Sequence, residues 1–139
     1  MELNINSPAY YTNNYGIDDE IYRMCNEIYL FMKSRNYSDI VTMIGIIPVV
    51  APKELTDNSS WEESIKVKKS IGLVIVYKHI DYDKYKNGTI EQRKKLTIKC
   101  ILEAILMIKK KPGTKFNAKQ FEIDLLNFVG YNKEELENI

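Results

Sequence analysis

Hydrophobic positions in the first third of the chain follow two different periods, and each predicts a different element. Residues 2–6 alternate Leu3 and Ile5 with polar neighbours, as a short half-buried strand does. Over residues 17–32, apolar side chains instead recur every three or four positions. This spacing predicts an amphipathic helix with one buried face.

Three further strands are predicted in the middle of the chain. Residues 40–50 are rich in β-branched side chains, but Pro48 has no backbone N–H to donate, so we expect an edge position or a bulge near it. The segment 65–69 (IKVKK) alternates, and the run 71–80 (IGLVIVYKHI) is apolar on both faces. The short link between these two runs contains Ser and Gly, which predicts a hairpin.

Capping signals predict the helices of the carboxyl-terminal half. Three residue pairs have the spacing of a capping box: Thr89–Gln92, Asn117–Gln120 and Asn132–Glu135. The first pair opens a long helix that Pro112 ends, and its wide apolar face around Ile101 and Ile105 predicts the central helix of the core. The other two pairs open a further helix and a short terminal one.

The predicted element order is β-α-β-β-β-α-α, followed by a short terminal helix. Helices that are segregated from the strands favour an α+β fold, with a mostly antiparallel four-stranded sheet and two or three long helices. No repeat or linker divides the 139 residues, and this length suffices to bury a core without a disulfide or a metal. We therefore expect a single domain over residues 1–139.

The sequence lacks the marks of export and of membrane insertion. Residues 1–10 have neither the basic start nor the apolar stretch of a signal peptide, and the uncharged run from Ile40 to Pro52 is too short to cross a bilayer. We therefore expect a cytoplasmic protein with no membrane partner. Cys25 and Cys100 lie within helical patterns among apolar residues, which is typical of reduced core thiols.

Motifs for catalysis and cofactor binding are absent from the sequence. It contains no GxGxxG, Walker A or GxSxG segment. The lone histidine, His79, follows an apolar strand with no Ser or Cys nucleophile nearby in sequence, and one His with two Cys does not supply a convincing zinc site. We therefore expect no enzymatic activity, no catalytic residue, no cofactor and no metal.

Charge is balanced over the whole chain but is segregated along it. Residues 1–65 carry net −6, residues 66–119 net +11 and residues 120–139 net −4. The basic segment makes a small nucleic-acid-binding domain the alternative function. However, the sequence pI is only about 7.7, and no RNP, KH or helix-turn-helix motif is present, so we do not expect nucleic acid as a partner.

Aromatic side chains outside any periodic stripe are candidates for anchors in a protein interface, because they bury a large area at little entropic cost. A cover over the open end of the core is the alternative role for such side chains. The candidates, together with the acidic residues beside them, are Tyr10, Tyr11, Tyr15, Trp61, Glu62 and Glu63.

Several segments together resemble the immunity protein 44 family of bacterial polymorphic-toxin systems. They are MELNIN, the first amphipathic helix, IGIIPVV, IKVKKSIGLVIVYKHIDYDKYK and LTIKCILEAILMIKKK, and the resemblance covers roughly residues 1–128. It implies a small non-enzymatic cytoplasmic protein that binds and neutralises a cognate protein toxin. The family supplies no binding motif that assigns interface residues.

The sequence leaves two toxin-binding surfaces open. The aromatic and acidic patch suits a basic toxin, because opposite potentials steer association. If the basic segment faces outward instead, an acidic toxin would dock on Lys66, Lys68, Lys94 and their neighbours. The sequence does not choose between these surfaces, and it does not predict an oligomeric state.

Overall fold

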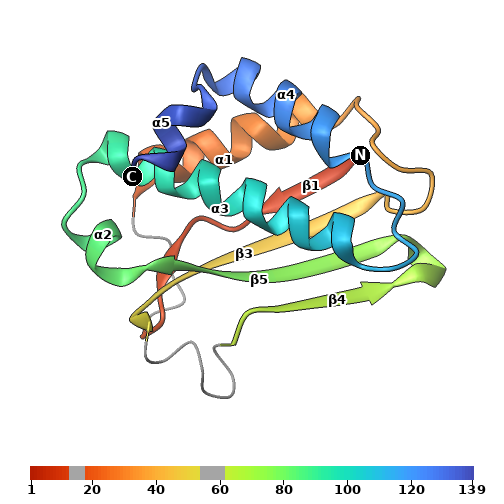
Figure 1. Ribbon diagram of the computed structural model, residues 1–139, viewed down its shortest axis with the longest axis horizontal. Helices are drawn as coiled ribbons and strands as arrows, with labels where there is room; N and C mark the ends of the chain where they lie inside the picture. The colour runs from red at the N-terminus through yellow and green to blue at the C-terminus, as the bar shows by residue number, and fades with distance from the viewer. Residues whose placement is uncertain (13–17, 54–61) are drawn as a thin grey trace.

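The computed structural model describes residues 1–12, 18–53 and 62–139, and in them helices cover one face of a sheet (Figure 1). The elements, in chain order, are β1 (Glu2–Ile5), β2 (Ala9–Tyr10), α1 (Asp19–Met32), β3 (Met43–Ala51), β4 (Ser64–Lys68), the 3-10 turn η3 (Lys69–Ile71), β5 (Leu73–Asp81), α2 (Tyr82–Lys86), α3 (Ile90–Lys110), α4 (Ala118–Val129) and α5 (Lys133–Glu137). The α+β class and the predicted order of the long elements are confirmed, and β2 and α2 are additions.

The described strands form a mixed sheet in the order β1-β3-β5-β4, with β2 beside β3. The β1–β3, β2–β3 and β3–β5 pairs are parallel, and only β4–β5 is antiparallel. The expectation of a mostly antiparallel sheet is therefore corrected. The predicted hairpin of β4 and β5 does form, and β5 is the strand of the hairpin that pairs with β3. This arrangement gives β5 two neighbours and makes it parallel to β3.

The strand that contains Pro48 is neither at an edge nor bulged, so that expectation is wrong. Its register with β5 runs without a break through the pair Pro48 and Lys78. On the other side, Ile46 O accepts from Asn6 N, and Val50 O accepts from Tyr11 N. Backbone groups two residues apart point to the same side, so Pro48 faces the gap between β1 and β2. Its missing N–H therefore costs no ladder hydrogen bond.

Two of the three predicted capping boxes are confirmed. They open α3 at Thr89 and α5 at Asn132. At the start of α4, the Asn117 side chain accepts from the backbone N–H of Gln120, as predicted. The return bond is absent, because the Asn117 backbone N–H donates to the backbone oxygen of Tyr37 at 2.9 Å, while Gln120 Nε2 donates to Asp124 Oδ1 at 2.8 Å.

The main core lies between the sheet and the helices α1 and α3. Alternate residues of β3 and β5, such as Ile44 and Val76, point toward α3, where Ile101 and Ile105 are almost fully buried. Helices α4 and α5 pack against α3 on its side away from the sheet (Figure 1). The predicted apolar face of α3 is too wide, because Leu106 is 46% exposed and Ile90 is 36% exposed.

The buried centre of α3 gives a stability prediction. Replacing Ile101 by Ala leaves a cavity in the core, so we expect the free energy of unfolding to fall by about 2 to 5 kcal/mol. Urea denaturation followed by circular dichroism measures this loss, with Lys99→Ala on the same helix as the control. Equal midpoints for the two variants would contradict the placement of Ile101.

Candidate functional site

Four tyrosines gather where the parallel strands end. The ring of Tyr10, in β2, lies 5.5 Å from that of Tyr82 and 6.5 Å from that of Tyr85, both in α2. Tyr11 lies 6.2 Å from Tyr82. The Tyr85 side chain is fully buried, whereas Tyr10 is half-buried against the small core cluster that includes Val50 and Tyr85. The carboxyl ends of parallel strands therefore carry an aromatic cluster.

A largely buried ion pair ties this cluster to the start of α1. Asp18 precedes the helix but makes no side-chain cap bond. Its carboxylate instead accepts from Arg93 Nη1 at 3.0 Å and from the Tyr85 hydroxyl at 3.1 Å. The same guanidinium donates to the backbone oxygens of Tyr85 and Lys86. Arg93 thus joins α1, α2 and α3 through charge-assisted hydrogen bonds.

The predicted interface residues do not form one contiguous cluster in the described part of the chain. Tyr10 and Tyr11 belong to the tyrosine cluster, and Tyr15 and Trp61 lie outside the described residues. Glu62 is exposed and Glu63 half-buried, just before β4. Strands β3 and β5 lie between the tyrosines and these two glutamates. Binding of a partner by this patch stays a prediction.

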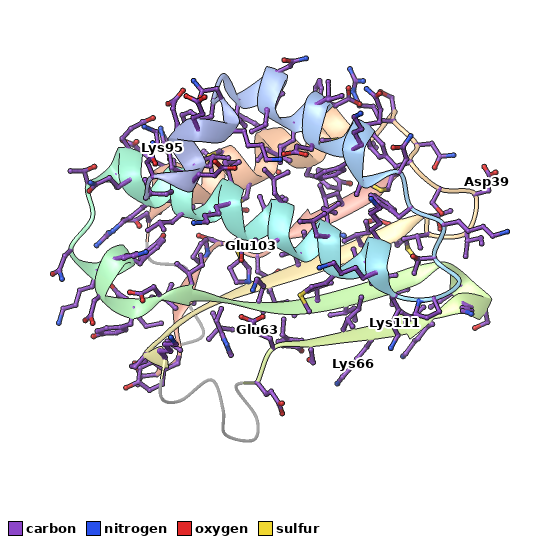
Figure 2. All side chains as sticks on the ribbon, viewed as in Figure 1. Asp39, Glu63, Lys66, Lys95, Glu103 and Lys111 are labelled. Carbon is purple, nitrogen blue, oxygen red and sulfur yellow. The ribbon has the colours of Figure 1, made fainter. Side chains whose placement is uncertain are left out.

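Glu63 belongs to a charged network at the edge of β5 (Figure 2). Its carboxylate accepts from Lys78 Nζ at 2.8 Å, and Glu103 of α3 lies 3.2 Å from the same ammonium. Burial lowers the pKa of Lys78, but hydrogen bonds and charges from the two glutamates outweigh it and leave the pKa above its usual value. The network therefore holds Lys78 as a cation between the sheet and α3.

His79 is a buried imidazole, and neither ring nitrogen has a hydrogen-bond partner among the described residues. Its side chain is 6% exposed, and the nearest carboxylate oxygen, Glu63 Oε1, is 3.8 Å from Nδ1. Burial lowers the pKa of His79 below its usual 6.5, with the Glu63 charge opposing this shift. A neutral imidazole in a packed site suits a structural role better than proton transfer to a substrate.

The remaining reactive side chains are also placed in the core. Both cysteines are free and buried, as predicted. Burial raises the pKa of Cys25 to about 12 and raises that of Cys100 as well, so neither thiol is an activated nucleophile. Among the described residues, no group of three or more His, Cys, Asp and Glu side chains could hold a metal ion. No described helix combines the length and hydropathy needed to span a membrane.

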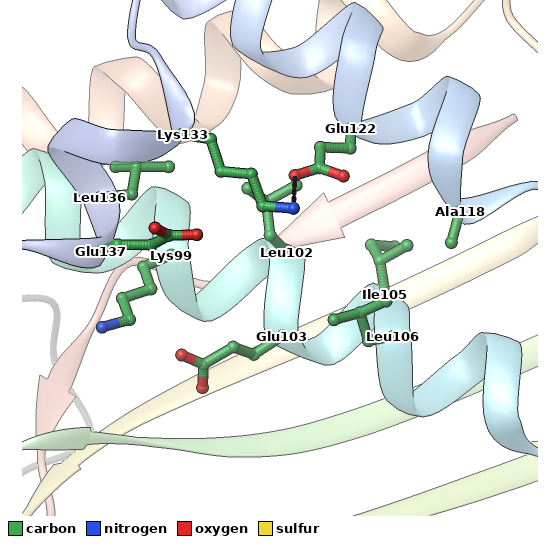
Figure 3. Close-up of a pocket in the computed structure, with 10 residues that line it drawn as sticks. All are labelled: Lys99, Leu102, Glu103, Ile105, Leu106, Ala118, Glu122, Lys133, Leu136 and Glu137. Carbon is green, nitrogen blue, oxygen red and sulfur yellow. Dashed lines mark ion pairs between the residues drawn. The ribbon is translucent and has the colours of Figure 1, made fainter.

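A pocket of about 200 Å³ opens between α3, α4 and α5 (Figure 3). Leu102, Ile105 and Leu106 supply part of its apolar lining, and the ion pair between Lys133 and Glu122, at 3.6 Å, lies among the charged lining residues. No His, Cys, Ser or Thr is among the described lining residues. The pocket can accept an apolar side chain, but its lining offers no nucleophile.

The fold sorts most lysines and arginines of the basic segment into two groups; Lys84, Lys86, Lys99 and Lys119 belong to neither. Members of the first group form ion pairs: Lys78 with Glu63 and Glu103, Arg93 with Asp18, Lys94 with Glu20, and Lys95 with Glu135. The second group is exposed around the β4–β5 turn and the end of α3, and we call it the lysine end. It comprises Lys66, Lys68, Lys69, Lys109, Lys110, Lys111 and Lys115.

No member of the lysine end forms an ion pair within the described part of the chain. A Cβ on Gly113, just after α3, would lie 2.5 Å from Lys69 Nζ, so the turn and the helix end are adjacent. Figure 2 shows Lys66 and Lys111 on one side of the molecule and Lys95 on the other. Lys94, expected to act with Lys66 and Lys68, therefore belongs to the other end.

Sequence patterns gave only part of this arrangement. The alternation of the β4 segment already indicates that Lys66 and Lys68 share one face of a strand. The pairing of Asp18 with Arg93 spans 75 residues and carries no local signal. The same holds for the meeting of Tyr10 with Tyr82, which depends on where β2 docks.

The ion pair of Asp18 and Arg93 gives a second stability prediction. Their side chains are only 13% and 16% exposed, so Arg93→Met leaves a poorly solvated carboxylate without its partner. We expect a loss of about 2 to 4 kcal/mol in the free energy of unfolding. The double variant Asp18→Asn with Arg93→Met is expected to lose less than the sum of the single variants in urea denaturation. Additive losses would show that the two groups do not interact.

His79 gives a prediction about pH. The unfolded chain protonates this imidazole more readily than the folded one, so protonation favours unfolding as the pH falls through 6.5. We expect the native protein to lose more stability than His79→Leu between about pH 8 and about pH 5. Urea midpoints of both proteins across this range measure the difference. Parallel curves would rule out this contribution of His79.

Comparison with known proteins adds one match. A model of the immunity protein 44 family matches residues 1–131 of the 139-residue chain. No curated protein and no solved structure matches the chain. The match covers almost the whole chain, including every strand and the helices α1, α2, α3 and α4. The chain therefore belongs to the immunity protein 44 family.

Proposed function

We propose that this protein is an immunity protein that binds a cognate toxin and neutralises it by occupying its surface, without chemistry of its own. The observation that carries the proposal is the family match over residues 1–131. A neutralising protein needs a stable fold and a surface complementary to its target, but no reactive group.

The placement of reactive side chains supports a function in binding. The buried thiols have raised pKa values, and the imidazole is buried with no hydrogen-bond partner in the part of the chain that the structure describes. A nucleophile or general base must instead reach a substrate with a suitable protonation state. Exposed charge is abundant by comparison, and charge accelerates the encounter between proteins. We place the protein in the cytoplasm of the producing cell, where a toxin that acts inside the cell must be stopped.

Co-expression with the polypeptide encoded immediately upstream tests the function. We expect that polypeptide alone to stop growth, and co-expression of this protein to restore growth and to give a complex that co-purifies. An unrelated folded protein of similar size, expressed from the same vector, is the control. A toxic upstream polypeptide that is neither bound nor neutralised would overturn the proposal.

Two surfaces are proposals for the toxin contact. The first is the predicted patch of Tyr10, Tyr11, Tyr15, Trp61, Glu62 and Glu63. The second is the lysine end with the sheet surface beside it. The first surface suits a basic toxin and the second an acidic one. Charge-reversing substitutions at the two surfaces therefore distinguish the two proposals.

A further inference from the structure

The helices cover only one face of the sheet (Figure 1). Side chains alternate along a strand, so the residues between the core positions of β3 and β5 point away from α1 and α3. In the described chain no helix packs on these side chains, and they are half-buried rather than buried. We call them the outer face: Met43, Gly45 and Ile47 of β3, and Leu73, Ile75 and Tyr77 of β5.

The centre of the outer face consists of aliphatic side chains beside a glycine. Gly45 pairs directly with Ile75, and a Cβ added to the glycine would lie 3.7 Å from Cγ1 of that isoleucine. The absence of a side chain at residue 45 therefore leaves a shallow place beside Ile75. When a partner covers an apolar surface, the free energy falls by roughly 25 cal/mol per Å² of apolar area removed from water.

Positive charge borders this apolar centre. Lys66 and Lys68 of β4 pair with Ile75 and Leu73, so their side chains stand on the outer face. Lys66 Nζ lies 5.9 Å from the centre of the Tyr77 ring. The rest of the lysine end continues this charge around the β4–β5 turn to the end of α3.

Few acidic groups lie near these lysines. Asp39 lines the same surface hollow as Lys115, and Glu2 is on β1, at the opposite edge of the sheet. Several other basic residues of the segment, such as Lys78 and Arg93, have carboxylate partners within the fold. The lysine end therefore presents a net positive field that is available to a partner.

The chemistry of this surface favours a protein partner over nucleic acid. Proteins that bind single strands stack successive bases on aromatic rings. The outer face offers only Tyr77 for stacking, and the other described side chains of its centre are aliphatic. Lysines around an aliphatic centre match a protein surface that has apolar side chains within an acidic rim.

We propose that the toxin docks on the outer face and the lysine end, and that the toxin surface received there is acidic. This inference rests on the proposed function and names the contact surface for it. It takes the basic side of the molecule as the interface, rather than the aromatic and acidic patch. The association should then depend on salt, because the steering charges are exposed.

Paired charge reversals at the two ends of the molecule test the proposal. Lys66→Glu with Lys68→Glu changes the outer face, and Lys84→Glu with Lys86→Glu makes the same charge change beside the tyrosine cluster. The control is closely matched, since all four lysines are exposed and Lys86 lies over the ring of Tyr82 as Lys66 lies over Tyr77. Thermal melting first establishes that both full-length variants fold.

Association rates with the purified upstream polypeptide then separate the possibilities. We expect the Lys66 and Lys68 variant to associate at least about tenfold more slowly and to lose most of its salt dependence, with the Lys84 and Lys86 variant close to native. Ile47→Lys probes the apolar centre and is expected to weaken binding as well; if it does not fold, Ile75→Thr replaces it. A native rate for the first variant with loss in the second would overturn the proposal in favour of the tyrosine end.

Two other outcomes also count against the inference. The first outcome is that Lys66 and Lys68 have no role in toxin binding and only keep the edge strand from pairing with the sheet of another molecule. In that case, Lys66→Ala with Lys68→Ala would self-associate in ultracentrifugation but bind the upstream polypeptide normally. A labelled single-stranded RNA or DNA oligonucleotide that binds tightly at physiological salt would assign the surface to nucleic acid.

Failure of the native protein to bind or neutralise the polypeptide would remove the proposed function and this inference together, whereas binding unaffected by the outer-face variants would remove the inference alone.

Discussion

The placement of β5 between β3 and β4 is the constraint on which the rest of the structure depends. The strand is apolar from Leu73 to Tyr77, and an edge position would leave one side of this stretch without hydrogen bonds. Between β3 and β4, its backbone is paired on both sides over most of its length. Its inner side chains, such as Val74 and Val76, then face α3 and complete the main core.

The same constraint produces the outer face. An apolar strand in the middle of a sheet presents side chains to both faces, but the described helices cover only one of them (Figure 1). Leu73, Ile75 and Tyr77 are therefore left half-buried opposite the core. Stability of the core and the presence of an apolar surface for a partner thus have one physical origin, which is the composition of β5.

Pairing of charges divides the molecule into two ends. Around the start of α3, Arg93, Lys94 and Lys95 are bound to carboxylates from α1 and α5 or from just before α1. These contacts hold helices together, although Lys84 and Lys86 of the neighbouring α2 stay exposed. At the other end of α3, the last turn meets the β4–β5 turn, and both contribute lysines. Lysines at a helix carboxyl terminus are stabilised by the helix dipole, so the fold tolerates this concentration of charge.

Reactive side chains are kept away from solvent by the same packing. Cys25 and Cys100 face the core from α1 and α3, and His79 is buried beside Glu63. Neither the described pocket between α3, α4 and α5 nor the outer face contains one of these groups. The exposed features of the molecule are thus shape, apolar area and charge, which are the means by which a protein binds another protein.

The sequence by itself determined the long elements and most of their ends, because periodicity and capping act over a few residues. The helix from Ile90 to Lys110, its capping box at Thr89 and the hairpin of β4 and β5 follow from such local signals. The sequence did not determine the strand order, because no local signal shows whether β4 or β5 is the neighbour of β3. That choice depends on pairing with β3, which lies more than 20 residues away from β5. Pro48 misled for the same reason: its missing N–H faces a gap that only the docking of β1 and β2 creates. The tertiary structure also decided which lysines are free, since a charge is neutralised by neighbours in space and the carboxylates that bind Lys78 and Arg93 come from distant segments.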